Sequence, residues 1–212
     1  MAWGRLGKLQ VIPTQSRSVG IFRRISIPLH GVFIYGAFEG IMVSLFPVFL
    51  LHRGFQVRET GYALALFVVG GGIAMLPVSY FGDRLGKGVI LGIVSGLGLG
   101  GVLGLGMASS VWMLMALSFV VGACLGPVFP MTLAMIGEIL RPDELPSGSA
   151  LFTSAFSYGC VVGPLVAAVS MSRWGDDFIF LAVDLLLVIL LLRLFRKRPG
   201  AIEPLECMGE PS

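Results

Sequence analysis

The sequence alternates between long apolar blocks and short polar connections. The blocks are roughly 18 to 25 residues long, which is the length that crosses about 30 Å of hydrocarbon as a helix. With ends uncertain by a few residues, they cover 27–51, 60–81, 89–107, 111–136, 149–171 and 178–194. This pattern predicts an all-α membrane protein, a bundle of six transmembrane helices spanning 27–198.

The connections between the blocks are short, as in HRGFQVRE, GDRLGKG and SRWGDD. Each predicted helix therefore runs antiparallel to the one before it. Backbone amides in lipid must find partners within the protein, so only helices or closed barrels cross a membrane. The blocks are too long and too uniformly apolar for the alternating strands of a barrel.

Basic residues are unequally divided between the two sides of this predicted bundle. Twelve fall on the side of both chain ends: Arg5, Lys8, Arg17, Arg23, Arg24, Arg84, Lys87, Arg141, Arg193, Arg196, Lys197 and Arg198. Three fall on the other side: Arg53, Arg58 and Arg173. Cytoplasmic loops of membrane proteins are enriched in Lys and Arg, so we expect both termini in the cytoplasm.

The two ends of the chain lie outside the apolar blocks. We interpret 1–26, which is basic and contains no acidic residue, as a cytoplasmic segment, and 199–212 as a cytoplasmic tail. The first segment has no compact apolar core with a cleavage site, so a secretory signal is not expected. A mitochondrial presequence shares its basic, acid-poor character and stays as the alternative.

Composition changes this picture little. The chain is 56% hydrophobic and 13% charged, about half the charged share of soluble proteins. Its net charge of +3 comes from residues that flank the apolar blocks, so no nucleic-acid partner is expected. The three cysteines, Cys124, Cys160 and Cys207, form no C-x-x-C pair, so neither a disulfide framework nor a metal site is predicted.

The sequence carries none of the usual catalytic motifs. It lacks the G-x-x-x-x-G-K-[ST] loop of nucleotide-driven pumps, the G-x-S-x-G of serine hydrolases and the H-E-x-x-H of zinc proteases. Its two histidines, His30 and His52, lie near opposite ends of the first block. We therefore expect neither an enzyme nor a bound cofactor.

Glycine and proline mark candidate packing positions. Gly92, Gly96, Gly100 and Gly104 recur every four residues on one side of the third block. Such a chained G-x-x-x-G lets another backbone come close, either within the bundle, as we expect, or in a dimer. Prolines, which favour bends, lie inside or near the ends of the blocks: Pro47, Pro77, Pro127, Pro130 and Pro164.

Two acidic residues fall inside predicted spans. Glu39 lies at the middle of the first block, where burying an ionisable group costs about 2.5–3.5 kcal/mol. It is either a proton or substrate site or a hydrogen-bonded packing residue, and Tyr35, one turn earlier, shares its face and can donate a hydrogen bond to it. Asp184 lies nearer a membrane edge, where a structural role is favoured, through a pair with Arg173 or contact with another helix.

The connection between the second and third blocks, SYFGDRLGKG at 79–88, combines charge with glycine. The glycines allow a tight reversal. Asp83 is placed to cap a neighbouring helix, and Arg84 and Lys87 to pair with acids such as Glu138. The loop is either a plain charged turn or a latch whose ion pairs form in one conformation and break in another.

At this loop the sequence resembles the major facilitator superfamily of secondary transporters. The signature of that family, G-x-x-x-D-R-x-G-R-[RK], matches at Asp83, Arg84 and Gly86, and Lys87 replaces the first arginine conservatively. Ser79 and Gly88 depart from it, as is typical of the copy in the second half of these transporters. GCVVGP, with Gly159, Gly163 and Pro164, is similar to the glycine–proline element of the fifth and eleventh helices of the family. The fourth block, GACLGPVFPM, is similar to the tenth helix.

The resemblance implies one half of a major facilitator fold, built as a 3+3 inverted repeat, most similar to the C-terminal half of a bacterial member. It implies alternating-access transport of a small solute, with proton coupling, in the bacterial inner membrane. The latch role then falls on Asp83, Arg84, Gly86 and Lys87, and Glu39 becomes a candidate for proton or substrate binding.

Members of the family normally have twelve helices, and this chain has six predicted ones. A second copy, another chain or the rest of a longer gene would supply the missing half. The alternative function is a non-transporting membrane scaffold or regulatory half.

Overall fold

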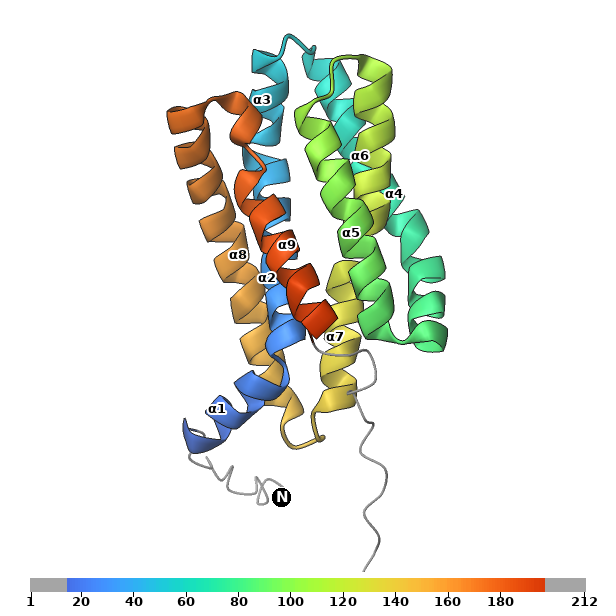
Figure 1. Ribbon diagram of the computed structural model, residues 1–212, viewed down its shortest axis with the longest axis vertical. Helices are drawn as coiled ribbons and strands as arrows, with labels where there is room; N and C mark the ends of the chain where they lie inside the picture. Colours follow the sequence, from blue (N-terminus) through green and yellow to red (C-terminus); the bar gives the residue numbers. More distant parts are fainter. Residues whose placement is uncertain (1–14, 197–212) are drawn as a thin grey trace, which may run out of the picture.

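The computed structural model describes residues 15–196, almost entirely as helices (Figure 1). The elements are α1 (Gln15–Arg24), α2 (Ser26–Ser44), α3 (Phe46–His52), α4 (Val57–Leu85), α5 (Lys87–Gly106), α6 (Val111–Leu125), α7 (Val128–Ile139), α8 (Leu145–Trp174), the 3-10 helix η1 (Asp176–Phe178) and α9 (Leu181–Arg196). Within this part of the chain, six helical segments are long and apolar enough to cross a membrane. The predicted all-α six-span fold is confirmed.

Two of the predicted spans are interrupted near prolines. The first breaks at Leu45 into α2 and α3, with Pro47 in the first turn of α3. The fourth breaks at Gly126 and Pro127, between α6 and α7. Proline lacks the amide that would continue the helical hydrogen-bond pattern, so these positions are natural breaks. Pro77 and Pro164 instead lie inside α4 and α8.

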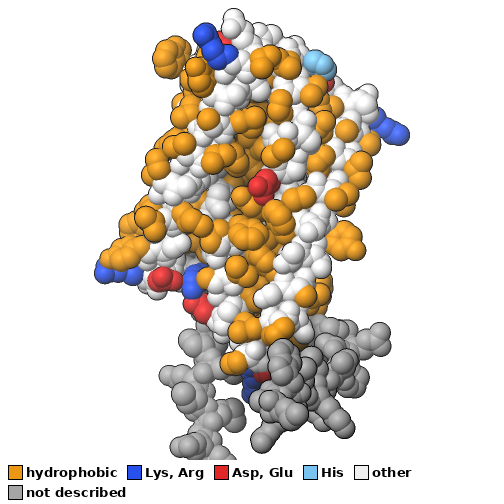
Figure 2. Space-filling view, turned by 180° about the vertical axis from the view of Figure 1, so that it is seen from behind, with side chains coloured by type: hydrophobic (Ala, Val, Ile, Leu, Met, Phe, Trp, Pro, Cys, Tyr) orange, Lys and Arg blue, Asp and Glu red, His pale blue; other side chains and the backbone are white. Residues whose placement is uncertain are grey.

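The helix α1 lies at the lower end of the bundle, and α9 runs along the bundle with its C-terminal end toward that same end (Figure 1). The α4–α5 turn and the α7–α8 connection are at that end as well. The sequence predicts one shared side for most of the basic residues. Those whose side chains are described, from Arg23 to Arg196, are therefore gathered at one end of the bundle. Figure 2 shows charged side chains toward the two ends of one face, and a mainly hydrophobic band between them.

The helix α1 packs against the bundle. Ile21 and Ile25 are almost completely buried, in a cluster with Leu29, Ile136 and Phe152. The described part of the basic N-terminal segment is therefore anchored to α2, α7 and α8 by apolar contacts.

Two helix pairs make the closest contacts in the bundle, α2 with α8 and α4 with α6 (Figure 1). A Cβ atom added to Gly159 or Gly163 would lie 2.3 or 2.4 Å from a backbone oxygen of α2. One added to Gly122 of α6 would lie 2.0 Å from the backbone oxygen of Phe67 on α4. Gly159 and Gly163 therefore lie at a close contact between helices, and both pairs depend on backbone approach that only glycine permits.

The two pairs are related by the repeat. The first span (α2) meets the fifth (α8), and the second (α4) meets the fourth (α6). In a 3+3 repeat, the first span corresponds to the fourth, the second to the fifth and the third to the sixth. The pair of the first and fifth spans therefore corresponds to the pair of the fourth and second. This is the arrangement expected of a 3+3 inverted repeat.

The predicted packing stripe on α5 does not form a close interface in the described bundle. Around Gly96 and Gly100 no atom lies within 4 Å of an added Cβ. At Gly92 and Gly104, the nearest atoms belong to the side chains of Leu194 and Leu117, at 3.8 and 3.1 Å. The expectation of tight packing along the whole stripe was wrong, because α5 turns a different side toward α6.

Candidate functional site

Glu39 lies within the span formed by α2, half-buried, as the sequence predicted. Its carboxylate has neither a hydrogen bond nor an ion pair with any residue between 15 and 196. The band around the middle of the face in Figure 2 is mainly hydrophobic and contains an acidic side chain. An ionisable group without a partner at this depth is expensive in lipid, which indicates a position that faces a cavity or binds a ligand.

Tyr35 belongs to an aromatic cluster drawn from three helices. Its ring centroid lies 5.9 Å from that of Phe129 on α7 and 6.2 Å from that of Phe156 on α8. Phe129 and Phe156 are in turn 5.4 Å apart, edge to face. The expected hydrogen bond from Tyr35 to Glu39 is not formed, because the tyrosine ring is engaged with these two phenylalanines.

The packing of α2 on α8 places Glu39 beside this cluster. A Cβ on Gly36 would meet the backbone oxygen of Phe156, and one on Gly40 that of Cys160, so the two helices run parallel and in register. Glu39, next to Gly40, is therefore level with Cys160, one turn beyond the ring of Phe156. The Glu39 carboxylate is close enough to interact electrostatically with Tyr35 and Cys160.

The helix α8 adds exposed hydroxyl groups to the same region. Thr153 and Ser157, one turn apart, are both exposed. Polar side chains exposed in the middle of a span typically face a protein partner or a water-filled cavity. Sequence reasoning missed these residues and also Phe129, Phe156 and Cys160. The four-residue spacing of Thr153 and Ser157 in an apolar block was a usable signal. No pattern in the sequence, in contrast, indicates that α7 packs against α8.

Asp184 lies in α9, a helix that contributes no ring to the cluster of Tyr35, Phe129 and Phe156. Its Oδ1 atom is buried and has no hydrogen-bond partner in the described structure. The expected pair with Arg173 is not formed among residues 15–196. Of the two alternatives for Asp184, contact with other helices is the one the structure supports, since α9 packs against α2 and α5.

The predicted latch residues lie where α4 turns into α5. Gly86 is the only residue between the two helices, and its φ of +93° requires glycine. Lys87 Nζ lies 3.4 Å from Asp83 Oδ1 and also pairs with Glu138 on α7. Ser79, Asp83, Lys87 and Met131 line a cleft of about 250 Å³ at this point.

Two expectations about this turn were wrong. The start of α5 has no side-chain cap, so Asp83 does not cap the next helix and pairs with Lys87 instead. Arg84 does not reach Glu138, because its guanidinium lies over the ring of Tyr80, 4.6 Å from the centroid. The ion pair from Lys87 to Glu138 is confirmed.

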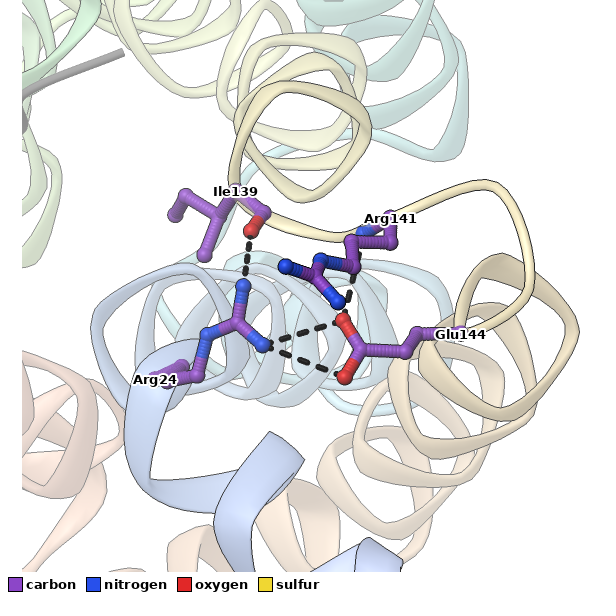
Figure 3. A network of polar contacts seen from close by, with 4 residues as sticks. All are labelled: Arg24, Ile139, Arg141 and Glu144. Carbon is purple, nitrogen blue, oxygen red and sulfur yellow. Dashed lines mark hydrogen bonds and ion pairs between the residues drawn. The ribbon is translucent and has the colours of Figure 1, made fainter. Parts of the chain in front are cut away.

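A second ionic network joins α1 to the α7–α8 connection (Figure 3). Arg24 Nη1 donates to both carboxylate oxygens of Glu144, at 3.2 and 3.0 Å, and Nη2 donates to the backbone oxygen of Ile139. Glu144 also accepts a hydrogen bond from the backbone amide of Arg141, at 3.1 Å. Sequence reasoning missed this network, because the two charges are 120 residues apart.

The opposite end of the bundle has its own ion pairs. His52 Nδ1 lies 2.9 Å from Asp176 Oδ2, and Arg53 pairs with Asp177. Arg53 also donates to the backbone oxygen of Gly106 at the end of α5. These contacts tie the end of α3 to α5 and η1, and no pattern in the sequence predicts them.

Comparison with known proteins identifies the family. The family model described as Major Facilitator Superfamily matches residues 29–206. The chain belongs to the major facilitator superfamily. Membership points to transport across a membrane rather than to an enzymatic activity, and the chain is a half-size domain of this family.

Relatives agree with this assignment. The chain is 26% identical over 176 residues to the uncharacterized MFS-type transporter YE1530 of Yersinia enterocolitica, covering 82% of this chain and 45% of that protein. It is 25% identical over 207 residues to the uncharacterized MFS-type transporter YfkF of Bacillus subtilis, covering 94% of this chain and 53% of the relative. The chain thus spans about half the length of the curated relatives it matches.

A solved structure has the same fold. The POT family transporter PepTSo aligns with a TM-score of 0.70 at 20% sequence identity, covering 90% of this chain and 39% of that protein. At this identity the likeness establishes the fold of the bundle.

Proposed function

We propose that this chain is one six-helix half of a secondary transporter, which moves a small solute by proton-coupled alternating access. It works with a second six-helix half, supplied by another copy, a separate chain or further helices of a longer protein. Its place is the plasma (bacterial inner) membrane, with both termini in the cytoplasm.

The unpartnered carboxylate of Glu39 carries this proposal. A charged carboxylate in the middle of a span costs about 2.5–3.5 kcal/mol, and no described side chain compensates it. Protonation removes that cost when the site faces a dry environment, and exposure to water restores the charge. A group that alternates between the two environments is suited to couple proton movement to transport.

The need for a second half rests on the exposed side of the same region. Thr153 and Ser157 present hydroxyl groups at a depth where lipid offers them no hydrogen-bond partner. A second bundle would enclose these residues and Glu39 in a shared cavity. The coverage of about half of each relative supports the same conclusion.

The ion pairs of Lys87 fit a latch in this mechanism. They connect the α4–α5 turn to α7, and at the end of the bundle such pairs are weak enough to break during a conformational change. The proposed role of Asp83, Arg84, Gly86 and Lys87 is therefore to favour one of the two access states.

Proton movement in everted membrane vesicles tests the proposal. Vesicles that contain the chain are energised, a panel of small solutes is added, and a fluorescent dye reports the pH gradient. We expect at least one solute to dissipate the gradient beyond vesicles without the chain. Glu39→Gln should abolish this response, and Asp184→Asn, the matched change of the other intramembrane acid, should preserve it.

Two results would contradict this proposal. Solute-dependent proton movement that survives Glu39→Gln would remove Glu39 from the mechanism. A stable complex with a partner chain and no flux for any solute would favour the non-transporting scaffold instead. Tags on both chain ends, probed on intact cells, test the orientation: labelling from outside would contradict cytoplasmic termini.

A further inference from the structure

We infer that Glu39 and the neighbouring rings of Tyr35, Phe129 and Phe156 form a binding site for an organic cation, a charged ammonium-like group on an apolar body. This inference rests on the proposed function, because it names the class of solute that the transporter half would bind. It adds a ligand to a site for which the transport proposal requires only a proton.

Charge is the first argument. The described basic residues lie at or near helix ends, for example Arg23 and Arg84 at the ends of α1 and α4 on one side, and Arg53 and Arg173 at the ends of α3 and α8 on the other. Inside the spans and away from their ends, the described charged groups are the acids Glu39 and Asp184, both half-buried. Glu39 is the one that lies beside α8, one to two turns from its exposed hydroxyls. A cationic solute compensates this charge, whereas an anionic one would be repelled.

The aromatic rings supply the second argument. Three rings, with centroids 5.4 to 6.2 Å apart, form a cluster one helical turn from the carboxylate. Their side chains are only partly buried, so ring surface is available to a ligand. Ring faces attract cations, and the combination of rings with a carboxylate is typical of sites for quaternary and other organic ammonium groups.

The spacing fits a ligand with two unlike ends. Tyr35 is level with Phe156, and Glu39 is level with Cys160, so the carboxylate and the ring cluster are about 6 Å apart along the helices. This separation suits a charged head at Glu39 and an apolar body against the rings. The buried ring of Phe152 lies 5.1 Å from that of Phe129 and extends the cluster into the core.

A neutral polar solute fits this site less well. Such a ligand needs several hydrogen-bond partners, since each polar group that loses water without a replacement weakens binding. The side chains that α2, α7 and α8 bring together beside Glu39 are mainly rings, and the hydroxyls of Thr153 and Ser157 are one to two turns away along α8.

Two ions of matched size and opposite charge test the inference. The purified chain, tagged and held on scintillation beads, is titrated with radiolabelled tetraphenylphosphonium and, separately, with tetraphenylborate. We expect saturable binding of the cation and none of the anion above beads without protein. Glu39→Gln should weaken cation binding at least about tenfold, and Phe156→Leu about threefold to tenfold.

Matched variants separate a specific site from general effects. Asp184→Asn removes the other intramembrane acid and should leave cation affinity unchanged. Phe195→Leu removes an exposed ring from the far end of α9 and should also leave it unchanged. Each variant is first shown to elute as a single species with the wild-type melting temperature, so that loss of binding does not reflect misfolding.

The outcomes separate this inference from the transport proposal. Equal binding of both ions, binding unchanged by Glu39→Gln, or no saturable cation binding by the folded wild type would each overturn the inference. Proton-coupled flux of a neutral solute without cation binding would leave the transport proposal standing and remove the cation site. Specific cation binding without any flux would support the site and contradict transport.

Discussion

The interface between α2 and α8 and the open side of α5 have the same four-residue glycine spacing but different surroundings. On α8, Gly159 and Gly163 lie against the backbone of α2, so closely that an added Cβ would lie 2.3 or 2.4 Å from an oxygen. On α5, Gly96 and Gly100 have no atom within 4 Å of that position. The spacing alone thus shows where a helix is able to approach, and the arrangement of the bundle decides whether one does.

The α2–α8 contact and the open side of α5 also differ in the side chains that they bring together. The close approach at α2–α8 holds Glu39 in register with Cys160 and brings Tyr35 onto Phe156. The open side of α5 contributes nothing to the described core. Substitutions of single glycines, ordered from the largest expected effect to the smallest, test the contrast.

Gly163→Val should have the largest effect, a loss of about 3 kcal/mol in the free energy of unfolding. The new side chain would meet backbone atoms of Ala37, which move only if the whole helix moves. Unfolding by titration with SDS in mixed micelles, followed by circular dichroism, measures the loss. Gly72→Val, on an open face of α4, is the control, and an equal loss in both would contradict the proposed role of the α2–α8 contact.

Gly122→Ala should cost about 2 kcal/mol, measured in the same way. One methyl group is smaller than the side chain of valine, but it would lie 2.0 Å from the backbone oxygen of Phe67. Gly61→Ala, which has open space around it, provides the comparison. Wild-type stability in Gly122→Ala would show that α4 and α6 are not as tightly joined as α2 and α8.

Gly98→Ala should cost only about 1 kcal/mol. Gly98 lies on the side of α5 that faces α6, where an added Cβ would lie 2.7 Å from a terminal methyl of Leu125. A flexible side chain can move aside, whereas a backbone cannot. A loss as large as that of Gly122→Ala would contradict this distinction, and in a Leu125→Ala background, where the contacting methyl is absent, Gly98→Ala should cost less than it does in the wild type.

Gly96→Ala should have the smallest effect, a gain of zero to about 0.5 kcal/mol, because alanine reduces the backbone freedom of the unfolded chain. Thermal unfolding monitored by size-exclusion chromatography is sufficient to compare it with the wild type. A clear loss of stability together with a smaller assembled mass would contradict the open position of Gly96. It would show that a partner helix covers this side of α5.

The sequence predicted the number and limits of the spans well. Long apolar blocks define helices because lipid leaves the backbone no other hydrogen-bond partners, and the blocks agree with α2 to α9 within a few residues. The sequence also singled out Glu39 and Lys87 as candidate site residues, because a charge inside an apolar block or beside one is a strong local signal. The pair of Lys87 with Glu138 was found because short loops place both at one end of the bundle.

Contacts between distant parts of the chain were predicted less well. Arg84 was assigned an acidic partner, but the nearby ring of Tyr80 occupies its guanidinium. The Arg24–Glu144 network and the rings of Phe129 and Phe156 were missed, because they come from helices far apart in the sequence. The glycine stripe of α5 was expected to pack tightly along its whole length and does not, because the spacing within one helix does not specify its neighbour.

By itself, the sequence determined that the chain has six membrane spans, which of their positions are charged and where glycine permits close approach. These properties depend on each residue and on the hydrocarbon around it. Only the tertiary structure decided which glycines meet a neighbouring backbone and which rings gather beside Glu39. Such contacts arise from the packing of one helix against another, and the spacing within a single helix does not specify its neighbour.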